Sequence, residues 1–348
     1  MTVTVAVDAN GADLGPAEVA IGAATAAAHG VRVLLFGPAD AIGEVGDGIE
    51  VIDSPVSIAK AADPVRAVRS TPDASIVQAA RAVAEGRAQA LVAGGSTGAA
   101  LAAGLFNIKR ASGIHRPALA IPIPVPGKPV TLVDVGANAE SRPEHLVQFA
   151  FMGAALAQVV LGVEQPRVAL MSNGEEAERG TPLVQEAHDQ LARSPLRFVG
   201  NVEGMDLTSG VADVIVTDGF TGNVALKVAE GVSQTMLEAV RSAAMRSARA
   251  KLGGALLKPS LRVLRDQLDP EGPGGAYLLG LRQLGVVPHG RFTHFGWSQA
   301  ILLAARGVSG DIVGRTHAAL EAAGALRPKG AGGDALSSGD LTTVPSQP

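Results

Sequence analysis

The chain of 348 residues contains no cysteine. It can therefore form neither disulfide bonds nor thiolate metal sites, and no acyl-cysteine intermediate can carry a reaction. Aromatic residues make up only 3% of the chain while hydrophobic residues make up 47%, so the core must consist of Ala, Val, Leu and Ile. The formal net charge of −4 argues against a protein whose whole surface binds nucleic acid. What remains is a globular protein with an aliphatic core.

We expect no export signal, since residues 1–7 form a short strand-like run without a basic or long apolar segment. Two charge-poor stretches, residues 88–108 and 147–163, resemble membrane spans in part. Gly94-Gly95-Ser96-Thr97-Gly98 would break the first as a lipid-exposed helix, and the second is short enough to be a buried or subunit-facing helix. We expect a soluble, cytoplasmic protein.

Short strand-like segments alternate with Ala-rich helical segments along most of the chain. This alternation predicts an α/β fold, a layered and mostly parallel sheet with helices on both faces. The proline-rich residues 115–129 indicate an extended, turn-rich crossing. The predicted strands are residues 3–7, 31–36, 89–92, 130–134, 168–171, 197–199 and 211–217; the predicted helices are residues 16–29, 75–85, 97–110, 143–161 and 181–192.

The pattern changes at residues 231–268, which predict a protruding hairpin of two helices joined at Gly253-Gly254, with Pro259 restarting the second. Residues 241–265 hold seven cations and no acid. We expect one domain over residues 1–325 that includes this hairpin, and a disordered tail over residues 326–348, where Gly, Ser, Thr and Pro dominate.

Glycine-rich loops with small polar residues follow five of the strand-like segments. Each glycine lets the backbone approach an anion closely, and each following helix offers free N–H groups. One such loop alone is weak evidence for a binding site, but five such loops on one sheet edge would form an anion-binding site. The candidate binding residues in these loops are Asp8, Asn10, Gly11, Gly95, Ser96, Thr97, Gly98, Asp134, Asn138, Asn173, Glu176, Thr221 and Gly222.

Several cofactor and nucleophile motifs are missing from these loops. The chain has no G-x-G-x-x-G fingerprint with a following acid, no P-loop and no G-x-S-x-G elbow. Its seven histidines are scattered and form no ligand pair, so we predict no structural metal.

Ordered blocks over about residues 3–310 resemble the PlsX family of phosphate acyltransferases. The blocks are Val5 to Pro16, Asp63-Pro-Val-Arg-Ala-Val-Arg69, Arg116-Pro-Ala-Leu-Ala120, Asp134-Val-Gly-Ala-Asn138 with Pro143 to Gln148, and Val214 to Lys227, the most specific. The chain departs from the usual pattern at Asn10, Ala12, Ser96 and Arg179. Ser96 keeps a hydrogen-bond donor where the family usually has Asn, and Arg179 keeps the positive charge of the usual Lys.

The resemblance implies a homodimeric enzyme related in fold to isocitrate dehydrogenase and phosphotransacetylase, with no metal or organic cofactor. It would transfer a long-chain acyl group from acyl-carrier protein to inorganic phosphate, and the acyl phosphate would serve bacterial phospholipid synthesis. The absence of cysteine fits this reaction, since phosphate can attack a thioester without a covalent enzyme intermediate. Such an attack requires orientation, worth about 7–11 kcal/mol, and donors to the tetrahedral intermediate, worth about 2.7–4 kcal/mol each.

For this chemistry the candidate catalytic residues are His289, Lys227, Arg179, Asp218 and Asn223. His289 would protonate the departing thiolate, and the two cations would neutralise phosphate. Alternatively, His289 is an ordinary surface residue and Lys227 a solvated helix residue. The acids Asp8, Asp134 and Asp218 would orient cations and set loops.

The basic hairpin has three interpretations that are open at this point: a solvated face, a dock for the acidic carrier protein, or a peripheral contact with anionic membrane. Two other functions also remain open, namely a short-chain acyl-CoA phosphotransacylase and an inactive anion- or lipid-sensing homologue. The candidate partner and membrane residues are Arg241, Arg246, Arg249, Leu256, Leu257 and Lys258.

Overall fold

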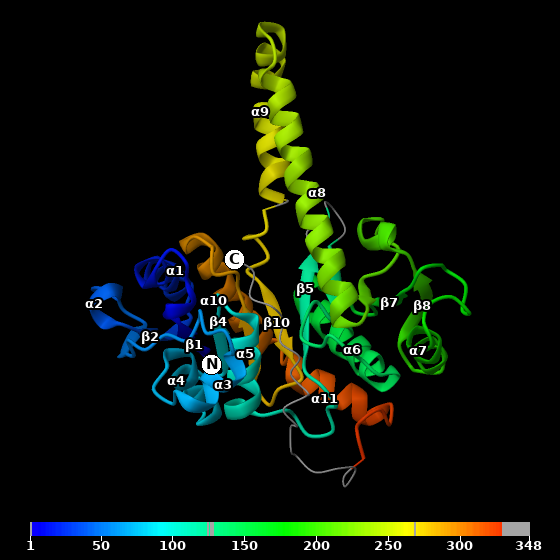
Figure 1. The fold of residues 1–348 in the computed structure, drawn as a ribbon, viewed down its shortest axis with the longest axis horizontal. Coiled ribbons are helices and arrows are strands. Elements are labelled where there is room, and N and C mark those ends of the chain that lie inside the picture. Colours follow the sequence, from blue (N-terminus) through cyan, green and yellow to red (C-terminus); the bar gives the residue numbers. More distant parts are fainter. Residues whose placement is uncertain (1, 124, 126–128, 268, 329–348) are drawn as a thin grey trace.

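A single eleven-stranded sheet runs through the computed structural model, which describes residues 2–123, 125, 129–267 and 269–328 (Figure 1). The strand order is β3-β2-β1-β4-β11-β10-β5-β6-β9-β7-β8. The strands are β1 Thr4–Asp8, β2 Arg32–Gly37, β3 Ile49–Asp53, β4 Ala90–Ala93, β5 Ala118–Ile123, β6 Val130–Val133, β7 Arg167–Met171, β8 Arg197–Val202, β9 Val214–Val216, β10 Ala276–Leu279 and β11 Leu284–Val287.

Helices cover both faces of the sheet. The α-helices are α1 Pro16–Ala28, α2 Ala39–Ile42, α3 Pro64–Ser70, α4 Ser75–Ala84, α5 Thr97–Ala103, α6 Pro143–Leu156, α7 Pro182–Ala192, α8 Gly219–Met245, α9 Ala248–Gln267, α10 His294–Ser309 and α11 Ile312–Ala322. Alternate residues of a strand supply the two cores: Val5 and Val7 pack with α1 and α10, while Ala6 packs with α4 and α5. The mostly parallel α/β fold expected from the sequence is confirmed.

The centre of the sheet reverses direction three times. Strand β10 is antiparallel to both β11 and β5, and β5 is antiparallel to β6. Strands β6, β9, β7 and β8 are parallel to one another and therefore run opposite to the parallel group of β1, β2, β3, β4 and β11. The prediction that all five glycine loops share one sheet edge is thus wrong: the loops after β1 and β4 lie at one edge, and those after β6, β7 and β9 at the other.

The reversal depends on strands that the sequence analysis did not assign, β10, β11 and β5. Residues 115–129 were expected to be a turn-rich crossing, but Ala118–Ile123 form a central strand. Pro122 is tolerated because pairing with β10 ends at Ala120, so Pro122 pairs with β6 alone. Strand β3 was also missed.

One helical segment, Pro143–Leu161, is long and apolar enough to cross a membrane by composition. It consists of α6 and the π-helix Ala157–Leu161 that continues it. Its most apolar window is 72% buried within the molecule, where Phe149 and Met152 belong to the core. This is the packing of a core helix, as expected from the sequence.

Helices α8 and α9 form the protruding hairpin, which extends from the body in Figure 1. The predicted join at Gly253-Gly254 is wrong: α8 ends at Met245, and Ser247 caps α9 by accepting a hydrogen bond from the Ala250 N–H (3.1 Å). Gly254 instead lets the two helices approach closely, since a Cβ there would lie 3.0 Å from that of Ala244. Pro259 lies inside α9 and does not restart it.

Leu256 and Leu257 consequently lie within α9 and not at the tip of the hairpin. Both are exposed, as are the predicted partner residues Arg241, Arg246, Arg249 and Lys258. Of the predicted tail, residues 329–348 lie outside the described part of the chain.

Candidate functional site

The first loop cluster consists of residues 8–13, 94–98 and 288–290, which follow β1, β4 and β11. Its backbones are in direct contact: a Cβ on Gly11 would overlap the Gly94 carbonyl, and one on Gly95 would overlap Gly11. Gly95 has φ of +82°, a conformation that favours glycine. The Asp13 N–H donates to the Gly290 carbonyl (2.8 Å). The structure therefore brings the predicted residues of the first two loops beside the loop of His289.

Asp8 is the buried acid of the first loop cluster. Its Oδ1 accepts hydrogen bonds from the Ser75 hydroxyl (2.6 Å) and the Asn10 N–H (3.2 Å). Burial raises the pKa of Asp8 to about 6, although these two hydrogen bonds oppose the shift. The Asn10 side chain donates to Ser75 Oγ and to the Ser54 carbonyl, so this departure from the family pattern is accommodated in a connected network.

Ser96, Thr97 and Gly98 begin helix α5. Ser96 Oγ accepts a hydrogen bond from the Ala99 N–H (3.2 Å), which makes Ser96 the N-cap. Thr97 is exposed and Gly98 contacts Pro64 of α3. The Ser96 hydroxyl proton is not used in this cap, so Ser96 retains the donor that the predicted role requires.

The second loop cluster consists of residues 134–138 and 217–223, which follow β6 and β9. Asp134 is fully buried, and its carboxylate accepts hydrogen bonds from the N–H groups of Leu119, Gly136, Ala137 and Asn138 and from the Asn138 side chain, at 2.8–3.2 Å. Burial raises the pKa of Asp134, and the hydrogen bonds oppose this. Asp134 therefore fixes the loop, and Asn138 is held further by the Pro117 carbonyl (2.8 Å).

Helix α8 starts inside the second loop cluster. Asp218 caps it, accepting from the Thr221 N–H (2.9 Å) and hydroxyl (2.7 Å). Gly222 has no room for a side chain, because a Cβ would overlap the Asp134 carbonyl oxygen. The Asn223 side chain lies against Gly136. The predicted residues of these two loops are thus together, with the acids in loop-setting positions.

The loop of residues 172–180 follows β7, which β9 separates from β6. Arg179 Nε lies 3.2 Å from Glu176 Oε2, and both side chains are exposed. Asn173 is exposed as well. Among the residues that the structure describes, no hydrogen bond or ion pair joins this loop to either cluster, so Arg179, Asn173 and Glu176 stand apart from the other predicted residues.

Helix α8 links the second loop cluster to the first. Lys227 Nζ, two turns into the helix, lies 2.9 Å from Glu230 Oε2, and Glu230 Oε1 lies 3.7 Å from Nε2 of His289. The predicted catalytic residues Lys227 and His289 therefore meet through a carboxylate. Glu230 was not selected from the sequence, and its only signal there was the i, i+3 spacing from Lys227.

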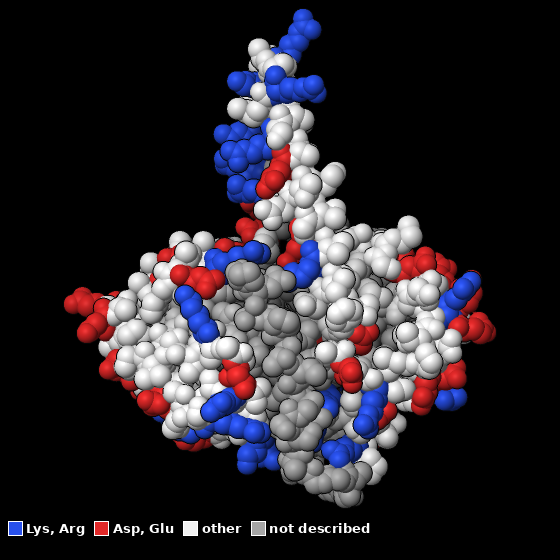
Figure 2. Space-filling model, in the orientation of Figure 1, with Lys and Arg blue, Asp and Glu red and all other residues white. Residues whose placement is uncertain are grey.

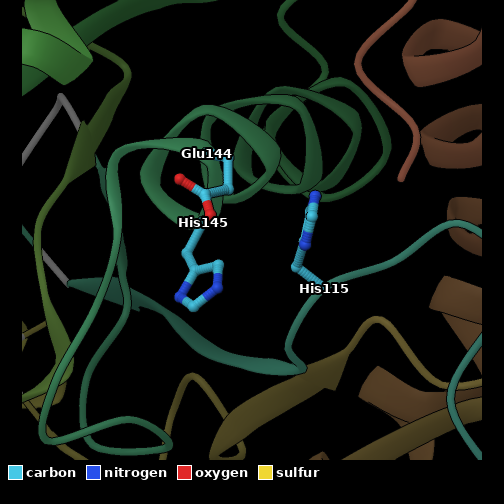
Figure 3. A group of neighbouring side chains, drawn as sticks. All are labelled: His115, Glu144 and His145. Carbon is cyan, nitrogen blue, oxygen red and sulfur yellow. The ribbon is translucent and has the colours of Figure 1, made fainter. Parts of the chain in front are cut away.

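Only His115, Glu144 and His145 form a possible metal-ligand group in the described ranges, with their ligand atoms within 4.8 Å of one another (Figure 3). His145 Nδ1 accepts a hydrogen bond from the Arg142 N–H (3.2 Å), so the neutral ring carries its proton on Nε2 and offers no lone pair there. Burial lowers the pKa of His145 to about 4, and the positive charges of Arg116 and Arg142 contribute. Protonated nitrogen and nearby cations disfavour a metal ion at this group.

Comparison with known proteins gives the family. A family model described as "Fatty acid synthesis protein" matches residues 3–315. A phosphate acyltransferase of Geobacillus thermodenitrificans is 41% identical over 91% of this chain and 98% of its own, and one of Lactococcus lactis is 40% identical over 89% and 96%. The chain belongs to this family of phosphate acyltransferases, as its sequence motifs indicated, and it is an acyltransferase.

Solved structures show the same fold at low sequence identity. A phosphotransacetylase from Streptococcus pyogenes is 16% identical with a TM-score of 0.61, covering 88% of this chain and 94% of that one. A branched-chain phosphotransacylase from Enterococcus faecalis is 15% identical with a TM-score of 0.54, covering 88% and 100%. The expected relation to the phosphotransacetylase fold is confirmed.

Close packing at the start of α8 gives a stability prediction. The change Gly222→Ala is expected to lower the free energy of unfolding by about 3 kcal/mol, because the added methyl group overlaps the Asp134 carbonyl. The matched control is Gly253→Ala in α9, where no atom lies within 4 Å and the helix gains about 0.5–1 kcal/mol. Thermal unfolding of both variants measures the difference; equal midpoints would show that this contact does not constrain the fold.

Proposed function

We propose that the enzyme transfers a long-chain fatty acyl group from acyl-carrier protein to inorganic phosphate, forming acyl phosphate for phospholipid synthesis in the cytoplasm. The observation that carries the proposal is the set of curated relatives about 41% identical over nine-tenths of the chain, all named phosphate acyltransferase. Two glycine-rich loop clusters joined by a helix with Lys227 and Glu230 support it, since they offer backbone donors and a cation to an anionic substrate.

In this reaction a phosphate oxygen attacks the thioester carbonyl carbon and the carbon–sulfur bond breaks. Lys227 offsets the charge of phosphate, and N–H groups of the first loop cluster, with Ser96, donate to the oxygen of the tetrahedral intermediate. The electron pair of the broken bond goes to sulfur, which takes a proton from His289. No covalent enzyme intermediate is needed, in keeping with a chain that has no cysteine.

The reaction is tested by mixing the purified protein with long-chain acyl-carrier protein and phosphate and trapping acyl phosphate as its hydroxamate. We expect product that depends on phosphate and requires no added metal or nucleotide. Product from short acyl-CoA alone would favour the phosphotransacylase alternative. Phosphate binding without product from any donor would favour the inactive sensing homologue.

The proposal includes a homodimer that forms through α8. Exposed apolar side chains occupy one i+4 ridge of this helix, and such ridges pack into grooves of other helices. This apolar ridge runs along a helix of 27 residues and is exposed to solvent. A second copy of the chain supplies the matching ridge by symmetry. The ridge residues, 43–66% exposed, are Phe220, Val224, Val228, Val232, Met236 and Val240.

Val232→Glu is expected to convert the dimer to a monomer, because it places a charge in the middle of this ridge. Ser233→Glu adds the same charge at the neighbouring exposed position and is the control. Light scattering after size-exclusion chromatography measures the mass of each. A dimeric Val232→Glu variant, or a monomeric wild type, would refute the α8 interface.

Helix α9 supports a second part of the proposal, contact with acidic partners. Its cations gather along one side of the hairpin, as Figure 2 shows, while Leu252 and Leu256 are 68% and 77% exposed. Cations beside exposed leucines suit shallow binding to anionic lipid. The proposed dock for the acidic carrier protein is Arg241, Arg246 and Arg249, close to the turn of the hairpin.

Leu256→Glu is expected to reduce co-sedimentation with phosphatidylglycerol vesicles several-fold, since it removes apolar area and adds a like charge. Ser260→Glu, also exposed on α9, adds the charge without removing a leucine. Equal binding of the wild type and both variants would argue against a membrane contact through this helix.

A further inference from the structure

Glu230 lies where the two halves of the candidate site meet. It is on the third turn of α8, with a side chain 25% exposed, and its two carboxylate oxygens face different partners. Oε2 contacts Lys227 Nζ of the same helix at 2.9 Å, and Oε1 faces His289 Nε2, from the loop after β11, at 3.7 Å. One carboxylate thus joins an ammonium group from one cluster's helix to an imidazole from the other cluster.

The charges around Glu230 keep it ionised. Burial acts to raise the pKa of Glu230, but His289 and Lys227 outweigh burial and lower the pKa to about 2. Two further acids lie near the loop of His289. A Cβ on Gly290 would lie 2.9 Å from the Asp13 carboxylate, and Glu271 accepts hydrogen bonds from Thr293 at the end of the loop. The His289 ring is also packed edge-on against Phe292, with ring centroids 5.4 Å apart, which limits its rotation.

We propose that Glu230 is a positioning residue that holds His289 in one orientation and one tautomer for proton transfer, while it fixes Lys227 beside it. The proposal rests on the proposed function. A carboxylate oxygen 3.7 Å from Nε2 favours the tautomer with its proton on that nitrogen, which leaves Nδ1 to exchange a proton with substrate. The same logic governs the acid of a Ser-His-Asp triad, where the carboxylate orients the ring without taking up its proton.

In the proposed step, the protonated imidazole carries protons on both nitrogens. As the carbon–sulfur bond breaks, the electron pair moves to sulfur and the Nδ1 proton follows it, giving a free thiol. The neutral ring that remains keeps its Nε2 proton toward Glu230. Negative charge on Glu230 therefore stabilises the proton-loaded ring before the transfer and fixes the tautomer after it.

A purely structural role is the competing explanation, because the same ion pairs also tie the base of the hairpin to the opposite half of the sheet. Glu230→Gln separates the two roles: the amide keeps the size and hydrogen-bonding capacity of the side chain, but it has no charge and accepts either tautomer. Glu238→Gln is the matched control, an exposed acid two turns further along α8 whose carboxylate accepts a hydrogen bond from the Gln234 side chain (3.4 Å).

Two measurements on the full chain test the proposal. The first is a ¹⁵N NMR measurement of the His289 ring, assigned by its loss in His289→Gln. We expect the neutral ring to carry its proton on Nε2 in the wild type and in Glu238→Gln, and a mixture of both tautomers in Glu230→Gln. The second is the pH profile of kcat for acyl phosphate formation. In Glu230→Gln we expect a fall of about tenfold in kcat, with the alkaline limb moved to lower pH.

The outcomes separate this inference from the proposed function. A wild type that makes no acyl phosphate would refute the function, while the NMR measurement would still decide whether Glu230 controls His289. An active wild type whose His289 tautomer and pH profile are unchanged in Glu230→Gln would overturn the inference. If Glu230→Gln does not fold, Glu230→Asp replaces it: we expect a shifted profile from the shorter carboxylate, and an unshifted one would likewise overturn the proposal.

Discussion

The reversal at the centre of the sheet determines where everything else in the site can lie. Parallel strands deliver their carboxyl ends to one edge, so a sheet without β10 and the β5–β6 turn would have collected all the glycine loops together. The observed sheet divides them between opposite edges. A reaction that needs residues from both sets then requires an element that crosses the sheet, and α8 begins in one set and reaches the other within three turns.

Helix α8 holds a fixed direction because its first turn is rigidly anchored. Asp218 caps its first turn, and the second loop cluster leaves no space at Gly222. Asp134 holds that loop with hydrogen bonds to four backbone N–H groups and one side chain, which is why a fully buried carboxylate is stable there. The carboxylates of Asp134 and Asp218, which would repel an anionic substrate in direct contact, therefore serve to hold the loop backbone in place.

The sequence predicted the strands β1, β2, β4, β6, β7, β8 and β9 and most helices before the hairpin, because their periodicity is local. It did not assign the edge strand β3 or the helices α2, α3, α10 and α11. Pro16 and Pro143 mark helix starts that the structure reproduces. The sequence did not indicate the strands whose formation depends on long-range pairing. Strands β10 and β11 are short, and β5 contains a proline that is tolerated only because its pairing with β10 ends before that position. The hairpin turn was misplaced for a related reason, since Gly253-Gly254 resembles a break until Ala244 is known to pack against Gly254.

Residue spacing likewise identified most loops of the site but not the connection between them. Lys227 and His289 are 62 positions apart, and no local pattern shows that Glu230 lies between them.

The distribution of charge distinguishes the hairpin from the rest of the chain. The seven cations of residues 241–265 leave −11 on the rest of the chain, so the hairpin is electrically opposite to the body from which it extends. Under the proposed function, an acidic carrier protein or an anionic lipid surface would be attracted to the hairpin and repelled by the body, and its approach would be oriented toward the helix that reaches the site.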